Sequence, residues 1–179
     1  SLVDEYGDKE GEIISGIIQK IESGTVIVDF NRAIGILPPQ EQISGENFRR
    51  GERIRAYLYA VDEGARGVSL KLSRTHPMFL KKLFELEVPE IANNVVEVKS
   101  IAREPGSRSK MAVFSTDDHV DPVGSCVGGR GVRVTTVTNE LGGEKVDIIE
   151  WSEDPSTYVS NSLSPAKVIN IEVNEAEHK

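Results

Sequence analysis

The stretch that decides the fold is VGGRGVRV, Val127 to Val134. It contains three glycines and an arginine within its first five residues, followed by the start of an apolar-periodic run. Glycine lets the backbone adopt left-handed conformations and lets a ligand approach closely. The stretch is therefore either an ordinary tight turn or a loop that holds phosphate groups.

Two phosphate-binding loops are excluded by spacing. A dinucleotide-binding loop requires G-x-G-x-x-G between a strand and a helix, but the third glycine position is occupied by Val134. A P-loop requires a lysine after its last glycine, and no lysine follows the cluster here.

The residues around the cluster predict an order of elements. PMFLKKLFEL (77–86) has helical periodicity, and VVEVKSIARE (95–104) and KMAVFS (110–115) are typical of strands. DPVGSCVG (121–128) predicts a helical turn capped by Asp121, and the run 131–141 predicts a second helix. Residues 88–94 are expected to form a connector. The remaining expectations are a strand at 145–151, a helix at 154–163 and a strand at 168–173.

In this order of elements, Gly128-Gly129-Arg130-Gly131 matches the G-x-x-G loop of a KH module, which clamps about four unpaired nucleotides. The alternative is an ordinary corner between two helices, in which the glycines only allow positive φ angles. The N-terminus of the following helix offers N–H groups to a phosphate, and Arg130 and Arg133 add positive charge. The bases would lie along a groove made by the short helices and the VDIIEW strand. The residues expected at this RNA site are Ser125, Val127, Gly128, Gly129, Arg130, Gly131, Val132, Arg133, Ile148 and Ile149, with Arg103, Arg108 and Lys110 beside it.

Residues 11–73 predict a separate domain built from strands. Alternating apolar residues occur at 11–21, 25–30, 33–37, 52–61 and 68–73, and Pro38-Pro39 stops the third segment. Five short strands favour a small closed barrel, because closure removes exposed strand edges. The change from a period of two to a helical period at Ser73–Pro77 sets the domain boundary. We therefore expect a linker at 1–10, a barrel at 11–73 and a KH domain at 74–179.

Charge and composition set limits on function. The net charge is −8, but residues 99–133 carry six bases and four acids, a local +2 around the glycine cluster. No apolar run is long enough to span a membrane, and the acidic N-terminus lacks a signal-peptide pattern. The single cysteine, Cys126, suits a reducing cytoplasm and is expected to be a small buried apolar residue. No metal or other cofactor is expected from the spacing of histidines and acidic residues.

Longer motifs carry a family resemblance. EVPEI, AREPGSRSK, DPVGSCVGGRGVRV and ELGGEKVDI lie in one continuous region that resembles the S1–KH core of the NusA family of bacterial transcription elongation and termination factors. The resemblance implies an all-β five-stranded OB-fold (S1) barrel followed by an α+β KH domain of the prokaryotic type (type II). It also implies binding of nascent single-stranded RNA in pausing, termination and antitermination.

The resemblance further implies partners beyond RNA. Members of the family bind RNA polymerase through an N-terminal domain and carry a second KH domain, so the present sequence is expected to be a fragment that lacks both. Antitermination factors are further possible partners.

The barrel departs from the S1 pattern, because the positions that carry a stacking phenylalanine and histidine in many S1 domains here hold Thr25 and Pro38-Pro39. Phe30, Arg55, Tyr57, Tyr59 and Lys71 remain as candidates for an aromatic and basic RNA surface.

Two other functions fit the same modules. An RNA-degrading enzyme can combine accessory KH and S1 domains, but with KH before S1, the reverse of the order here. A KH fold can also act as a structural adaptor that docks on proteins. Because no catalytic arrangement is visible in the sequence, a non-catalytic RNA-binding role is the main hypothesis.

Overall fold

The structure is a computed structural model that describes residues 2–64, 67–152 and 168–170. The chain divides into two compact units, Ser1–Lys82 and Leu83–Lys179. The expected boundary was Ser73–Pro77, whereas the division falls inside the helix α2 (Pro77–Glu87). Within the described residues, no helix is both long and apolar enough to cross a membrane.

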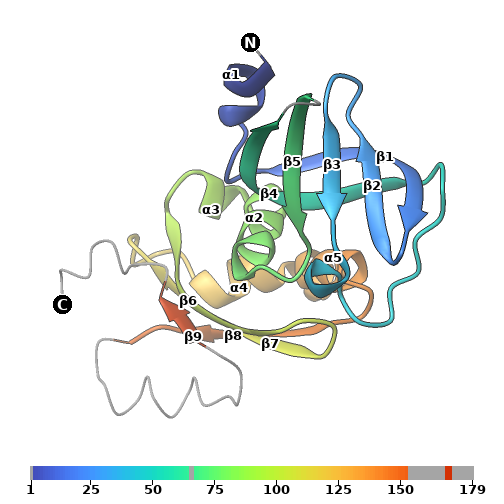
Figure 1. Cartoon of the computed structure of the whole chain (residues 1–179). Coiled ribbons are helices and arrows are strands. Elements are labelled where there is room, and N and C mark those ends of the chain that lie inside the picture. Colours follow the sequence, from blue (N-terminus) through green and yellow to red (C-terminus); the bar gives the residue numbers. More distant parts are fainter. Residues whose placement is uncertain (1, 65–66, 153–167, 171–179) are drawn as a thin grey trace. The chain divides into compact units, whose positions relative to one another are not determined.

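The first unit is a closed five-stranded barrel, as expected (Figure 1). Its strands follow the order β1-β2-β3-β5-β4, in which only β3 and β5 pair in parallel. This is the topology of an OB-fold barrel. The strands are β1 (Ile13–Glu22), β2 (Thr25–Asp29), β3 (Ile34–Leu37), β4 (Arg53–Gly64) and β5 (Gly67–Ser73), with the short helix η1 (Pro39–Glu41) after β3.

The alternation seen in the sequence places one face of each strand inside the barrel. Val28 on β2, Leu58 on β4 and Leu70 on β5 are fully buried, whereas their neighbours Asp29, Tyr59 and Lys71 are exposed. The hydrophobic core of this unit extends to Tyr6.

The N-terminal segment differs from the linker expected at 1–10. Leu2–Gly7 forms helix α1, Tyr6 is buried, and its hydroxyl donates a hydrogen bond to the carbonyl oxygen of Phe30 at 3.1 Å. Burial raises the pKa of the Tyr6 hydroxyl. The segment is short and acidic, so its single buried aromatic residue gave no periodic signal.

One aromatic ring and two glycines fill one part of the barrel interior. A Cβ atom at Gly16 would lie 2.7 Å from Cε1 of Phe30, and one at Gly35 would lie 2.5 Å from Cε2 of the same ring. At Gly35, Cδ1 of Leu72 is also only 2.8 Å away. The ring of Phe30 therefore occupies space that opens only because β1 and β3 carry glycine at these points.

The second unit is a four-stranded sheet whose helices α4 and α5 lie against it (Figure 1). The sheet order is β8-β7-β6-β9, with β7 and β8 parallel. The strands are β6 (Val96–Glu104), β7 (Arg108–Ser115), β8 (Lys145–Glu150) and β9 (Val168–Asn170), and the helices are α3 (Pro89–Ala92), α4 (Pro122–Val127), η2 (Gly129–Gly131) and α5 (Val132–Glu140).

This arrangement agrees with the expected α+β KH fold. Phe79, Leu80, Leu83 and Phe84 are buried, which confirms the amphipathic pattern of α2. Residues 88–94 contain the short helix α3 as well as a connector. The helix expected at 154–163 and residues 171–173 of the last expected strand lie outside the described residues.

We predict that Gly35→Ala destabilises the barrel, because the added methyl group collides with Phe30 and Leu72. Overpacking of this kind costs about 1–3 kcal/mol, measurable by denaturant unfolding. Gly7→Ala is the matched control, since a Cβ at Gly7 meets no atom within 4 Å. Equal stability of the two variants would show that the Phe30 ring does not require Gly35.

Candidate nucleic-acid interface

The G-x-x-G loop, Gly128 to Gly131, joins α4 to α5. Its backbone φ angles are 81° at Gly128, 59° at Arg130 and 74° at Gly131, all in the left-handed region. Gly131 donates its backbone N–H to the carbonyl oxygen of Gly128 at 2.9 Å, which closes the turn. The glycine content of the sequence thus reflects a backbone conformation that most residues avoid.

The glycines at 128 and 129 have different surroundings. A Cβ at Gly128 would lie 2.8 Å from Cγ of Arg133 and 3.0 Å from its backbone nitrogen, so only glycine fits there. A Cβ at Gly129 would meet no atom within 4 Å. The inner side of the loop is therefore packed, and the backbone at Gly129 is open to a ligand.

The two arginines at the loop also differ. Arg130 is exposed, and no hydrogen bond or ion pair holds its side chain within the described part of the chain. Arg133 is half-buried: its Nη1 donates to the carbonyl oxygen of Ser125 at 2.8 Å and to Oε1 of Glu90 at 3.0 Å. Both arginines were expected to contact phosphate. In the structure, the guanidinium of Arg130 is available to bind a phosphate, whereas the side chain of Arg133 already links α3, α4 and α5.

A shallow depression of about 650 Å³ lies beside the loop. Gly128, Gly129 and Ser125 line it together with Val132, whose side chain is 60% exposed. Glu90 and Asp121 form acidic walls of the depression, and His119 also lines it. Asp121 occupies the expected N-cap position of α4, but its side chain makes no capping hydrogen bond.

The sequence did not identify Glu90 as a residue of the site. The one feature that could have indicated it is the EVPEI motif, which contributes to the family resemblance. The residue lies in a segment expected to be a connector, and only the fold brings its carboxylate to Arg133.

Cys126 lies on α4, two residues before the loop. It is fully buried, as expected, and burial raises the pKa of its thiol to about 12. The thiol is therefore protonated at neutral pH and unreactive while the domain is folded.

The β8 residues expected to line the groove lie on opposite faces of the sheet. Ile148 and Ile149 are adjacent along a strand, so their side chains point in opposite directions. Ile148 shares its face with the buried Val146. No more than one of the two isoleucines can face a groove beside the loop.

Arg103, expected to be a phosphate contact, is buried with only 6% of its surface exposed. Its Nε and Nη2 donate to the carboxylate of Glu144 at 3.0 and 2.9 Å. The same carboxylate accepts hydrogen bonds from Oγ of Ser109 at 2.7 Å and from the backbone N–H of Gly106 at 2.8 Å. This corrects the expectation, because the guanidinium is committed to an internal ion pair that ties the β6–β7 hairpin to the start of β8.

The neighbouring cations are nearer the surface. The Nε of Arg108 pairs with Oδ2 of Asp147 at 3.0 Å, and its side chain is 59% exposed. Lys110 is half-buried on β7 and interacts with other residues. Neither belongs to the lining of the depression beside the loop.

In the barrel, the three principal candidates occupy different environments. Phe30 is half-buried: its ring packs beside Gly16 and Gly35 and also lines a depression of the barrel, whereas Arg55 is exposed. Tyr57 is buried with its ring 4.7 Å from that of His76, and this burial raises the pKa of its hydroxyl. The expected surface of all three residues together does not form.

Tyr59 and Lys71, considered with them, do come together. They line a depression of about 600 Å³ with Ile36 of β3 and Gln40 of η1. Tyr59 is 36% exposed, and Nζ of Lys71 pairs with Oδ2 of Asp62 at 3.1 Å. An exposed aromatic ring beside a lysine is one arrangement on which bases stack.

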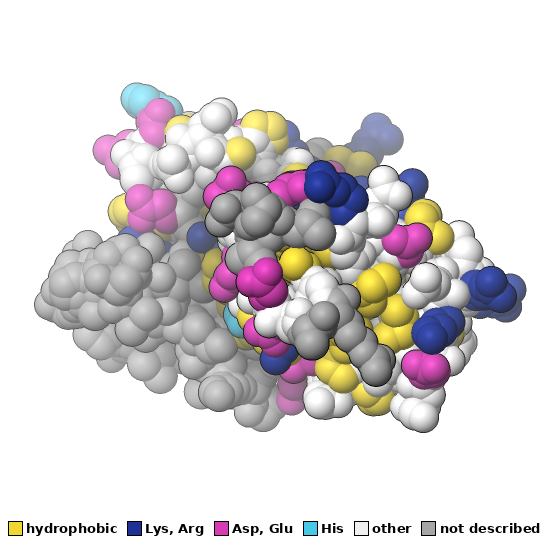
Figure 2. Space-filling view, turned by 45° about the horizontal axis from the view of Figure 1, so that its top comes forward, with side chains coloured by type: hydrophobic (Ala, Val, Ile, Leu, Met, Phe, Trp, Pro, Cys, Tyr) yellow, Lys and Arg dark blue, Asp and Glu magenta, His cyan; other side chains and the backbone are white. Residues whose placement is uncertain are grey.

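The molecular surface carries charges of both signs. On the face drawn in Figure 2, Lys and Arg side chains are interspersed with Asp, Glu and hydrophobic side chains. The net charge of −8 does not favour a broad basic footprint. Any contact with phosphate must therefore be local.

Comparison with known proteins assigns both domains. Residues 8–73 match the S1 RNA binding domain, and residues 74–151 match the NusA-like first KH domain. Three curated relatives bear the name transcription termination/antitermination protein NusA. The protein of Halalkalibacterium halodurans is 49% identical over 97% of this chain and 45% of its own length. That of Bacillus subtilis is 46% identical over 98% and 47%, and that of Thermus thermophilus is 48% identical over 99% and 46%. The chain thus spans about half the length of these relatives.

We predict that Glu144→Gln strongly destabilises the second unit, because Arg103 then remains buried without its counter-charge. Breaking a buried pair costs about 3–5 kcal/mol, and labelling of Cys126 by a thiol reagent would report the opening. Asp147→Asn is the control, since its exposed pair with Arg108 contributes about 1 kcal/mol or less. Slow labelling in both variants would contradict a structural role for the buried pair.

Proposed function

The chain belongs to the NusA family, and we therefore propose that it captures nascent single-stranded RNA during transcription pausing, termination and antitermination. The observation that carries this proposal is the loop Gly128–Gly131. It combines an open backbone at Gly129 with the exposed guanidinium of Arg130, directly before the N-terminus of α5. KH loops of this form clamp the backbone of about four unpaired nucleotides.

The chemistry of the loop supports capture of a phosphate rather than catalysis. Backbone N–H groups at the start of α5 and the positive end of its dipole favour an anion. Arg130 adds a charge-assisted hydrogen bond. Arg133, held by Glu90 and Ser125, keeps α4 and α5 at the spacing that the loop requires.

Modest affinity is expected from this site. Only one of its two arginines has an uncommitted guanidinium, and Glu90 and Asp121 line the adjacent depression. These carboxylates repel phosphate, so the bound backbone must follow the loop and keep away from the acidic wall. Exposed Val132 at the edge of the depression offers an apolar contact to a base.

The partners in transcription follow from the family. We assign contact with RNA polymerase to the N-terminal domain that the resemblance implies. Antitermination factors are candidate partners in the same setting, and the cytoplasm is the proposed location. The chain itself is assigned a non-catalytic role.

The double variant Gly129→Asp with Arg130→Asp tests the loop. Neither change disturbs packing, because Gly129 has open space and Asp tolerates the left-handed backbone of residue 130. We expect affinity for an unstructured 12-nucleotide RNA, measured by fluorescence anisotropy, to fall at least about ten-fold, which corresponds to about 1.4 kcal/mol.

The control is Asn139→Asp with Lys145→Asp, two exposed positions that change the charge by the same amount, −1 and −2, or −3 in total. We expect it to retain the RNA affinity of the unmodified chain. If the loop variant also retains that affinity, the loop is not the RNA clamp.

A further inference from the structure

A dense group of arginines lies on the barrel, in the sequence FRRGERIRAY. Residues 49–55 hold four arginines and one glutamate, or +3, in a chain whose net charge is −8. All four side chains are exposed. Within the described ranges, none of these guanidinium groups forms an ion pair, and the only side-chain bond is from Nη1 of Arg53 to Oγ of Ser15 at 3.2 Å. We call Arg49, Arg50, Arg53 and Arg55 the β4 arginine surface.

The strand geometry spaces two of these arginines evenly. Arg53 and Arg55 are two residues apart on β4 and face outward, which places them about 7 Å apart. Their partners across the ladder on β1 are Ile17 and Ser15, which are uncharged. This spacing is comparable to that of successive phosphates along an extended nucleic-acid strand.

The segment that carries Arg49 and Arg50 is fixed to the barrel. The backbone N–H of Gly51 donates to the carbonyl oxygen of Ile18, and that of Ile18 donates to the carbonyl oxygen of Glu52, each at 2.8 Å. Earlier in the segment, Glu46 forms a nearly buried ion pair with Arg74 at 2.7 Å. The backbone that carries these arginines is therefore fixed before any ligand binds, which lowers the entropic cost of binding.

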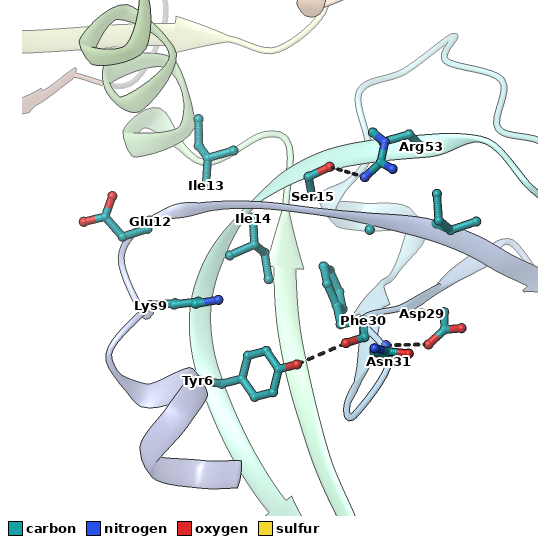
Figure 3. A pocket seen from close by; sticks show the side chains of 12 residues that line it. Tyr6, Lys9, Glu12, Ile13, Ile14, Ser15, Asp29, Phe30, Asn31 and Arg53 are labelled. Atoms are coloured by element: carbon teal, nitrogen blue, oxygen red, sulfur yellow. Dashed lines mark hydrogen bonds between the residues drawn. The ribbon is translucent and has the colours of Figure 1, made fainter.

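A depression of about 680 Å³ adjoins Arg53 (Figure 3). Figure 3 shows Tyr6, Lys9 and Ile14 around it, with Phe30 near its centre and Arg53 at its edge. It therefore combines aromatic and aliphatic walls with cations on two sides.

The two acidic groups in the lining of this depression are engaged. Oε2 of Glu12 pairs with Nζ of Lys82 at 3.5 Å, and Oδ1 of Asp29 accepts the backbone N–H of Asn31 at 2.7 Å. These contacts reduce the repulsion that a phosphate would otherwise meet here.

We propose that the β4 arginine surface and the depression beside Arg53 form a second contact site for single-stranded RNA. The arginines hold successive phosphates, and the depression accepts an unpaired base or its ribose. The site lies on the β1–β4 side of the barrel, whereas OB-folds commonly bind through strands 2 and 3. It rests on the proposed RNA-binding function but is separate from the loop at 128–131.

Single-stranded RNA fits better than other anionic partners. A groove that accepts a base requires the base to be unpaired. The spacing of phosphates along an extended nucleic-acid strand also matches the spacing of arginines at alternate positions of one β-strand. An acidic protein segment is the competing partner, and the experiment separates the two.

The test is the salt dependence of RNA binding by the whole chain, using a fluorescein-labelled 12-nucleotide oligouridine. The slope of log K against log salt has a magnitude of about 0.7 for each phosphate neutralised in a single strand. Arg53→Gln with Arg55→Gln should weaken binding and reduce the magnitude of the slope by about 1.4 for the two lost contacts. Arg53→Lys with Arg55→Lys keeps both charges and should preserve the slope.

The matched control is Lys20→Gln with Arg32→Gln, which removes two charges from cations already paired with Glu22 and Glu5. We expect its slope to equal that of the unmodified chain. Equal slopes for this control and for the Arg53 and Arg55 glutamine variant would overturn the proposal.

Three further outcomes show whether the second site or the proposed function itself is wrong. If the loop variant, Gly129→Asp with Arg130→Asp, abolishes binding while the arginine variant binds normally, the second site is wrong and the proposed function stands. If the arginine variant loses binding to a polyglutamate peptide but not to RNA, the surface belongs to an acidic protein and the proposal is overturned. Absence of RNA binding by the unmodified chain would overturn the proposed function itself.

Discussion

The contact of Arg133 with the turn before it is the constraint on which the candidate RNA site depends. The stem of this side chain occupies the space above Gly128, and its guanidinium bonds to the last turn of α4 and to Glu90 on α3. One residue thus joins three helices and requires glycine at 128. Because the inner side of the loop is filled in this way, the left-handed backbone directs Gly129 and Arg130 toward solvent, where a phosphate can reach them.

An acidic chain that binds an acidic polymer must concentrate its uncommitted cations. Among the described residues, the structure pairs some basic side chains with carboxylates and leaves others without a carboxylate partner. Arg103 lies in a buried ion pair, and Arg133 is held by Glu90. Arg130 at the loop and the β4 arginine surface on the barrel keep their charge available. Binding through such local groups is sensitive to salt, since each neutralised phosphate releases counterions.

Sequence patterns predicted the fold well because both domains have regular periods. Strand alternation located the five barrel strands, and the spacing G-x-x-G within its order of elements located the loop. The patterns failed where a function depends on which partner a side chain meets. The amino-acid sequence alone does not distinguish Arg103, which pairs with Glu144 forty-one residues away, from Arg130, which faces solvent. For the same reason the sequence did not show that Phe30 would be half-buried, with Gly16 and Gly35 making room for part of its ring.

The most direct test of the central claim is an NMR titration of the ¹⁵N-labelled chain with the 12-nucleotide oligouridine, followed through backbone amide shifts. We predict that the amides of Gly128 to Gly131 move first and furthest, and that those around the buried Arg103–Glu144 pair stay unchanged. If the loop amides do not move while RNA binds, the chain holds its RNA elsewhere and the loop is only a turn between helices.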